Sequence, residues 1–212
     1  MQNSMAFPAS LSEKYRPKTL DAFVGLEKPR KVLAKFAANP FPNAAFLFVG
    51  PSGTGKTSAA LALCEAIRGE LHHLTSGSCN QASVEDVTRQ CHYVPHNNSL
   101  HVVLVDEADQ MTPAAQLAFL SKLDGTAFPP QTVFIFTAND TERLQDRFLS
   151  RCMSLQFSSH GISKDAASLL ERIWIAEVGD TPEKPNFDRL VKDGKNNIRD
   201  AVNSLQVEIL AA

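Results

Sequence analysis

A glycine-rich segment at residues 50–57, G-P-S-G-T-G-K-T, constrains the fold of this chain more than any other stretch. The apolar run 45–49 precedes it, and residues 58–67 follow with the composition of a helix. A strand, a glycine loop and a helix in this order are the context that a phosphate-binding P-loop requires. Glycines let successive backbone N–H groups turn toward an anion, and the helix N-terminus adds positive dipole. The segment therefore predicts a nucleoside triphosphate site.

Within this motif we expect Lys56 to reach the β- and γ-phosphates and the Thr57 hydroxyl to bind Mg²⁺. A glycine-rich turn with a chance lysine is the alternative, and the strand and helix on either side argue against it. The residues expected to bind the nucleotide here are Gly50, Pro51, Ser52, Gly53, Thr54, Gly55, Lys56, Thr57 and Ser58.

A second apolar run, residues 100–105, ends in Asp106 and Glu107 about 50 residues after the P-loop. A central parallel strand, buried on both faces, delivers carboxylates at its C-terminal edge. We expect Asp106 to hold the Mg²⁺ and Glu107 to polarise the water that attacks the γ-phosphorus. Buried strands often end in acids, so this Walker B pattern alone is weak evidence for a nucleotide site. The P-loop that precedes it makes the evidence strong.

Three further runs, residues 70–75, 132–137 and 153–157, have the composition of strands and are separated by helical segments. This alternation implies right-handed βαβ crossovers and an α/β fold with a parallel sheet in a three-layer sandwich. Asn139 follows the second of these runs. It is either a turn residue or, beside a γ-phosphate, a side chain that holds the attacking water.

The pattern changes near residue 160, where strand-like runs stop. Residues 163–178 form an amphipathic helical segment, and shorter helical patterns follow at 187–191 and from 196 onward. We therefore predict two domains, an α/β nucleotide-binding domain at residues 1–159 and a small helical domain at residues 160–212.

Composition excludes some classes of function. The net charge of −2 gives no overall basic signal for nucleic acid, so DNA contact would need a local patch. No apolar run approaches the roughly 18 residues of a membrane helix, and the N-terminus lacks the regions of a signal peptide. Cytoplasm is the expected location.

The segment at residues 13–37 is rich in basic residues, and these form either a solvated helix face or a surface for phosphates. The seven basic residues are Lys14, Arg16, Lys18, Lys28, Arg30, Lys31 and Lys35.

The four cysteines are widely spaced and form no C-x-x-C pair. We expect reduced, mostly buried thiols without a metal role. His72 and His73 are adjacent, and adjacent residues of a strand point to opposite faces, so we expect no metal site there either.

Together these motifs resemble the AAA+ ATPases, and within them the clamp-loader branch of replication factor C small subunits and bacterial tau/gamma subunits. Residues 106–112, D-E-A-D-Q-M-T, are similar to the extended Walker B motif of that family, and Asn139 to its sensor 1. Residues 150–152, S-R-C, are similar to the motif whose arginine completes a neighbouring subunit's ATP site. Residues 197–201, N-I-R-D-A, are similar to sensor 2. The resemblance covers nearly the whole chain and implies that the helical domain is a lid.

The resemblance also implies roles for single residues. Arg151 would act on the neighbour's ATP, which makes hydrolysis depend on assembly, and Arg199 on the γ-phosphate of its own site. A surface arginine paired with a local acid is the alternative for Arg151. The expected catalytic residues are Glu107, Asn139, Arg151 and Arg199. The residues expected to wrap the adenine are Tyr15, Arg16, Pro17, Val24 and Gly25.

The function that the resemblance implies is ATP hydrolysis, with Mg²⁺, by a subunit that loads a sliding clamp onto DNA in replication. The implied partners are other AAA+ subunits, the clamp and primer-template DNA, in the cytoplasm or at the replication fork of the nucleoid or nucleus. The alternatives are a helicase loader, a branch-migration or repair ATPase, and a non-catalytic ATP-gated scaffold. A DEAD-box helicase would need a second RecA-like domain, for which 212 residues leave no room.

Three features depart from the family pattern. We expect the chain to lack the helical collar domain of clamp-loader subunits and the zinc-binding insertion of tau/gamma subunits. A helix is predicted to begin at Ser83, with Asp86 as its capping partner. In relatives this helix touches the DNA backbone, but here it carries only Arg89 as a cation, and phosphate binding requires several.

Overall fold

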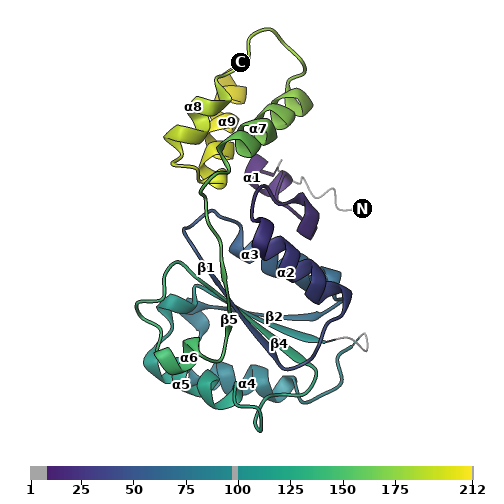
Figure 1. The fold of residues 1–212 in the computed structure, drawn as a ribbon, viewed down its shortest axis with the longest axis vertical. Coiled ribbons are helices and arrows are strands. Elements are labelled where there is room, and N and C mark those ends of the chain that lie inside the picture. The colour runs from purple at the N-terminus through teal and green to yellow at the C-terminus, as the bar shows by residue number, and fades with distance from the viewer. Residues whose placement is uncertain (1–8, 97–99, 212) are drawn as a thin grey trace, which may run out of the picture. The chain divides into compact units, whose positions relative to one another are not determined.

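The computed structural model describes residues 9–96 and 100–211, which form two compact units (Figure 1). The α/β unit comprises residues 17–158. The helical unit combines residues 9–16 with residues 159–211. The predicted boundary assigned residues 1–159 to the α/β domain, and the structure differs from it at the N-terminal end.

The centre of the α/β unit is a parallel five-stranded sheet with the order β2-β3-β4-β1-β5. Because the strands are parallel, every connection crosses over the sheet, and the connections from β1 to β2 and from β4 to β5 join strands that are not neighbours in it. The strands are β1 (Ala44–Val49), β2 (Glu70–Thr75), β3 (His101–Asp106), β4 (Thr132–Ala138) and β5 (Met153–Gln156).

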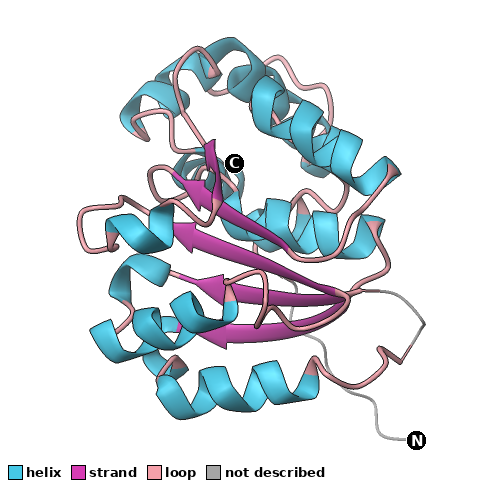
Figure 2. Ribbon diagram, turned by 60° about the horizontal axis from the view of Figure 1, so that its bottom comes forward, coloured by secondary structure: helices cyan, strands magenta, loops and turns pink. Residues whose placement is uncertain are grey.

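Helices cover both faces of this sheet, so the predicted three-layer arrangement is confirmed (Figure 2). Val102 and Leu104 of β3 pack into the hydrophobic cluster that holds α2 and α3. Val103 and Val105 pack into the cluster on the other face, with α4 and α5. β1 and the middle residues of β3 and β4 are apolar because both faces of these strands are buried. The helices are α2 (Glu27–Ala38), α3 (Lys56–Ala66), α4 (Gln81–Gln90), α5 (Pro113–Lys122) and α6 (Asp146–Leu149), with 3₁₀ turns η1 (Leu20–Ala22), η2 (Ser76–Ser78) and η3 (Ala108–Gln110).

The helical unit has a core of its own, built from α1 (Leu11–Lys14), α7 (Ser163–Glu177), α8 (Phe187–Asp193) and α9 (Ile198–Ala211). The N-terminal segment joins this unit because Leu11 is buried in its core and its N–H donates to Gln206 Oε1 at 3.0 Å. Lys14 forms an ion pair of 2.7 Å with Glu177, and the Tyr15 hydroxyl donates to the same carboxylate. These contacts correct the predicted domain boundary.

The start of α4 also corrects a prediction. Asn80, three residues before Ser83, is the N-cap, and its side chain accepts the Ser83 N–H at 3.0 Å. The Ser83 hydroxyl in turn accepts the Asn80 N–H at 2.9 Å, which completes a capping box. Ser83 is therefore the third helical residue, and Asp86 instead pairs with Arg89.

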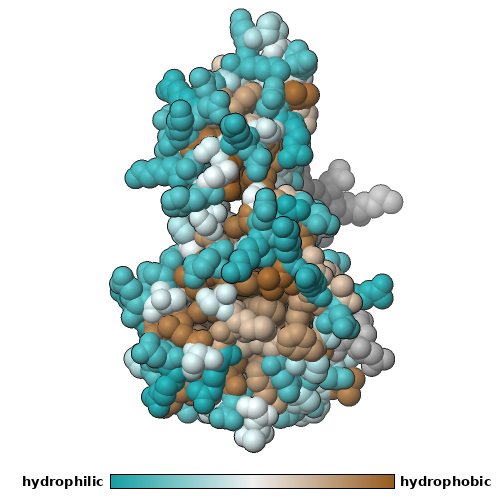
Figure 3. All heavy atoms as spheres, in the orientation of Figure 1, coloured by the Kyte–Doolittle hydropathy of each residue, from teal (hydrophilic) through white to brown (hydrophobic). Residues whose placement is uncertain are grey.

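On the face drawn in Figure 3, hydrophilic side chains cover most of the helical unit, whereas apolar side chains gather over part of the α/β unit. Among the described residues, no helix combines the length and the apolar character needed to cross a bilayer.

Candidate active site

The P-loop runs from the end of β1 to the start of α3, and two of its glycines are required by geometry. A Cβ on Gly50 would lie 1.9 Å from the carbonyl oxygen of Phe157, which is closer than atoms can approach. Gly55 is the N-cap of α3 with φ of 89°, a left-handed conformation that favours glycine. Its backbone also passes close to Phe23, because a Cβ there would lie 3.1 Å from the ring. The loop can thus bend sharply and still begin a helix.

Lys56 is the first residue of α3 and is buried in the loop. Its ammonium donates to the carbonyl oxygens of Gly50 at 2.6 Å and Pro51 at 3.0 Å. It also donates to Asn139 Oδ1, just beyond β4, at 3.1 Å. The loop therefore places a positive charge beside the carboxyl end of β4.

Thr57 and Asp106 meet although they are 49 residues apart in the sequence. The Thr57 hydroxyl donates to the Asp106 carboxylate at 2.8 Å, and the Thr137 hydroxyl donates to the same group. A hydroxyl and a carboxylate that converge from two elements are hard oxygen ligands, the type that Mg²⁺ binds. The donor set therefore fits a magnesium ion together with the phosphates of a nucleotide.

Glu107 directly follows β3 and has a left-handed backbone with φ of 55°. Such a conformation in a non-glycine residue is typical of functional sites, where surrounding contacts hold it. One contact is the hydrogen bond of 3.1 Å from the Glu107 N–H to Thr137 Oγ1. The side chain of Glu107 is exposed at the carboxyl edge of the sheet.

Three residues at this edge were missed from the sequence. Thr137 joins Asp106 to the Glu107 backbone, as described above. Asp109 is buried and accepts the Asn139 N–H at 3.3 Å, so it fixes the end of β4. His73 Nε2 lies 3.8 Å from the Asp106 carboxylate. A polar residue near the end of the apolar strand β4 is the sequence signal for Thr137, a histidine inside β2 is the signal for His73, and the final acid of the D-E-A-D run is the signal for Asp109.

The residues predicted to contact adenine fall in both units. Pro17, Val24 and Gly25 belong to the α/β unit, and Tyr15 and Arg16 belong to the helical unit. The hydrogen bond from Tyr15 to Glu177 is the main cause that raises the pKa of Tyr15 to about 12, followed by burial. Arg16 forms an ion pair of 3.5 Å with Glu13.

The two predicted arginines also lie in different units. Arg199 is exposed in the first turn of α9, where its N–H donates to the Asn197 side chain at 3.0 Å. Arg151 follows α6 and forms an ion pair of 3.4 Å with Asp124. Its guanidinium also donates to the carbonyl oxygen of Arg147 at 3.2 Å. Arg151 thus pairs with a local acid, as expected for a surface arginine, which was the alternative to its role in a neighbouring subunit's site.

The prediction that the thiols are mostly buried is confirmed. Cys64, Cys79 and Cys91 are buried, and Cys152 is half-buried. Burial raises the pKa of the first three thiols to about 11 and that of Cys152 to about 12. The thiols are therefore neutral at physiological pH.

Comparison with known proteins gives a matching family model, relatives that are similar in sequence, and solved structures that are similar in fold. Residues 46–159, more than half of the chain, match the model of the ATPase family associated with various cellular activities (AAA). The replication factor C small subunit of Thermofilum pendens is 33% identical over 204 residues, which cover 92% of this chain and 61% of that protein. The corresponding subunit of Natronomonas pharaonis is 32% identical and covers 92% of this chain and 60% of that protein. The chain thus spans about three fifths of the length of these curated relatives.

Solved structures with the same fold include the RuvB Holliday junction branch migration motor of Thermotoga maritima. It superimposes with a TM-score of 0.73 at 17% identity, over 93% of this chain and 72% of that chain. At this identity the likeness concerns the fold alone.

Proposed function

Since the chain belongs to the AAA family of ATPases, we propose that it binds and hydrolyses ATP at the carboxyl edge of its sheet, as a subunit of a clamp-loading motor. The observation that carries the proposal is the contact of 2.8 Å between the Thr57 hydroxyl and the Asp106 carboxylate, together with the Lys56 ammonium that the P-loop holds next to Asn139. These groups supply the oxygen ligands and the positive charge that a magnesium nucleotide requires.

In the proposed mechanism, the P-loop N–H groups and Lys56 bind the β- and γ-phosphates. Thr57 and Asp106 would hold Mg²⁺, which supplies positive charge to the phosphate oxygens. Glu107 orients and polarises the attacking water, and the Asn139 amide holds that water in line with the γ-phosphorus. Asp109 and Thr137 act as positioning residues because they fix the backbones of Asn139 and Glu107.

The remaining roles follow from the resemblance. Arg199 stabilises charge on the γ-phosphoryl group of its own site, and Arg151 does so in the site of a neighbouring subunit. In the neighbour's site, Arg151 would exchange its exposed ion pair with Asp124 for a pairing with phosphate. Exposed pairs contribute little, typically about 0–1 kcal/mol, so giving up this pair costs little free energy.

A clamp-loading role is favoured over branch migration by two observations. Replication factor C small subunits are similar at 33% and 32% identity over nearly the whole chain, whereas the likeness to the branch migration motor is one of fold. The S-R-C segment at residues 150–152 also matches the clamp-loader motif. The proposed partners are further AAA+ subunits, a ring-shaped sliding clamp and primer-template DNA.

The catalytic part of the proposal is tested with Glu107→Gln. We expect this variant to bind ATP with near wild-type affinity and to lose phosphate release, because the amide fills the same space but polarises water poorly. Equal loss of binding and hydrolysis would contradict the role of Glu107.

The clamp-loading part is tested by adding the clamp and primed DNA of the source organism. Stimulated phosphate release supports it, and absence of clamp binding contradicts it while leaving the ATPase proposal intact.

A further inference from the structure

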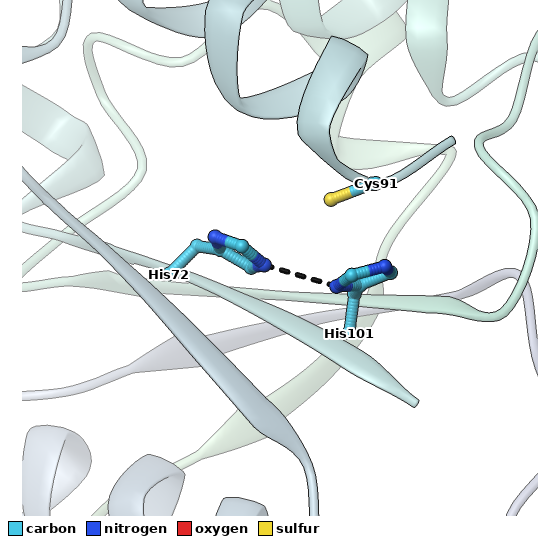
Figure 4. Close-up of side chains that lie close together, drawn as sticks. All are labelled: His72, Cys91 and His101. Carbon is cyan, nitrogen blue, oxygen red and sulfur yellow. Dashed lines mark hydrogen bonds between the residues drawn. The ribbon is translucent and has the colours of Figure 1, made fainter. Parts of the chain in front are cut away.

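His72, Cys91 and His101 form a compact cluster of nitrogen and sulfur atoms inside the α/β unit (Figure 4). Each residue comes from a different element: His72 from β2, Cys91 from the C-terminal end of α4, and His101 from the start of β3. The three potential ligand atoms lie within 4.8 Å of one another. His72 Nε2 and His101 Nδ1 are 3.0 Å apart, with the Cys91 side chain over the pair.

This cluster is separate from the candidate active site. His101 begins β3 and Asp106 ends it, five residues later. At about 3.3 Å per residue, the two positions are roughly 16 Å apart along the strand. The cluster has no part in the mechanism proposed above.

The sheet register explains how the two histidines meet. His101 lies opposite Glu70, two residues before His72 on the same face of β2. His73 points to the other face, as predicted, and its Nε2 is near Asp106. The expectation that these histidines form no metal site considered only neighbours in sequence. It therefore overlooked a partner on the adjacent strand.

The surroundings of His101 favour a ligand role. Its Nε2 is 2.9 Å from the carbonyl oxygen of Tyr93, and a carbonyl oxygen can only accept. Nε2 therefore carries the proton, and Nδ1 presents its lone pair to the cluster. A histidine that binds a metal usually donates its other ring N–H to a carbonyl or carboxylate in this way. His101 is 2% exposed and Cys91 is fully buried, so both lie inside the α/β unit and away from bulk solvent.

We propose that His72, Cys91 and His101 bind one Zn²⁺ ion, with the Glu70 carboxylate in the fourth position. Zinc prefers imidazole nitrogen and thiolate sulfur in a tetrahedral arrangement. Metal–nitrogen distances of about 2.0–2.1 Å and a metal–sulfur distance of about 2.3 Å place such ligand atoms roughly 3.3–3.7 Å apart. The histidine nitrogens already meet this spacing to within a few tenths of an ångström, and since all three ligand atoms lie within 4.8 Å, the sulfur needs to approach by no more than roughly 1 Å. Glu70 Oε2 is 3.9 Å from His101 Nδ1.

Binding is balanced by the release of one proton. The Cys91 thiol, which also hydrogen-bonds the Thr132 side chain, loses its proton to solvent as the zinc–sulfur bond forms. The Nε2 proton of His72 moves to Nδ1, so that the Nε2 lone pair faces the metal. The Gln90 side chain also hydrogen-bonds the imidazole of His72. The bound ion would join the edge strand β2 to β3 and α4.

The experiment uses the full chain, stripped with a chelator and titrated with Zn²⁺ against a chromophoric competitor, and separately with Co²⁺. We expect one high-affinity zinc ion per chain. We also expect a thiolate-to-cobalt charge-transfer band, which a magnesium site made of oxygen ligands cannot give. Zinc should raise the melting temperature of the wild-type chain. Absence of a high-affinity ion, or a cobalt complex without the thiolate band, would overturn the proposal.

Matched variants identify the ligands. Cys91→Ser and His72→Gln should each weaken zinc binding at least about tenfold, because loss of even an outer partner of a ligand typically costs 10–100-fold. Two control variants should bind zinc like the wild type. Cys79→Ser alters a buried thiol that packs in the same hydrophobic core as Cys91, and His92→Gln alters an exposed histidine. If Cys91→Ser does not fold, His72→Gln still tests the proposal. His72 is partly exposed, so its substitution disturbs the core less than that of the fully buried Cys91. Unchanged affinity in His72→Gln would contradict the assignment.

Discussion

At the scale of single residues, the contacts of the candidate site converge on Asp106. Its carboxylate accepts hydrogen bonds from the hydroxyls of Thr57 and Thr137, and His73 Nε2 lies 3.8 Å away. The sequence was sufficient to pair Thr57 with Asp106, because each occupies a fixed place in a known motif. It was not sufficient for Thr137, which becomes a neighbour of Asp106 only because β3 and β4 pair side by side.

Thr137→Val tests this neighbour. Valine keeps the shape of threonine but removes the hydroxyl that donates to Asp106 and accepts from the Glu107 N–H. We expect kcat for ATP hydrolysis to fall about tenfold or more with a smaller change in KM, because hydrogen bonds to charged groups contribute about 1.5–3 kcal/mol. Thr137→Ser, which retains the hydroxyl, should restore kcat. A serine variant as slow as the valine variant would show that packing, and not the hydroxyl, is what matters.

At the scale of elements, helix and strand existence followed from periodicity, whereas helix ends depended on contacts that periodicity does not contain. Residues 81–90 show this for α4, where Asn80 and Ser83 are both suitable capping residues. The structure uses both in one reciprocal box, with Asn80 as the N-cap. A pattern of residue types alone could not choose between them.

Asn80→Ala should therefore destabilise the chain by about 0.5–2 kcal/mol, the usual contribution of an N-cap side chain. The free energy of unfolding in urea measures this loss. Gln81→Ala, which alters the exposed first residue of α4, serves as the control and should change stability by less than about 0.5 kcal/mol. Equal effects of the two substitutions would argue against the capping box.

The attachment of the N-terminal segment to α7 gives the helical unit a dependence on pH. Hydrogen bonds from Lys14 and then Tyr15 hold the pKa of Glu177 below its ordinary value of 4.5. The stability that Glu177 contributes is therefore complete above that ordinary value and is lost as the pH falls through the folded-state pKa.

We accordingly expect Glu177→Gln to lower the urea midpoint at pH 7, and the difference from wild type to vanish as the pH falls below the folded-state pKa. Glu171→Gln, at an exposed glutamate of the same helix, should have little effect at either pH. A Glu177→Gln deficit that stays constant with pH would mean that the ionised carboxylate is not its source.

At the scale of the whole molecule, the sequence predicted a parallel α/β sandwich followed by helices, and both are present. It did not predict the strand order β2-β3-β4-β1-β5, because pairing between distant strands leaves no local pattern. Nor did it place residues 9–16 with the helical unit, since that requires knowing that Leu11 fits the core formed by α7–α9. The cluster of His72, Cys91 and His101 was missed for the same reason, because three separate elements contribute to it.

Assembly is the level at which Arg151 is proposed to act, and mixing two inactive variants tests this. Glu107→Gln removes the residue that polarises water, and Arg151→Ala removes the arginine offered to the neighbour. Each variant alone should lack ATPase activity. In an equal mixture, roughly a quarter of the sites would combine an intact Glu107 with a neighbour's Arg151, so activity should return. No recovery from a mixture that assembles would contradict a role in trans.

The central claim is that this chain cradles a magnesium nucleotide between its P-loop and Asp106, and calorimetric titration of the chain with ATP tests it most directly. We expect one ATP to bind per chain in the presence of Mg²⁺, with weaker binding in a chelator. Lys56→Ala should lower the affinity about 10- to 100-fold, because it removes a charged donor to phosphate. Lys31→Ala, at an exposed lysine of α2, should bind ATP like the wild type. A wild-type chain without measurable affinity for Mg·ATP, or a Lys56→Ala variant that binds it equally well, would contradict the claim.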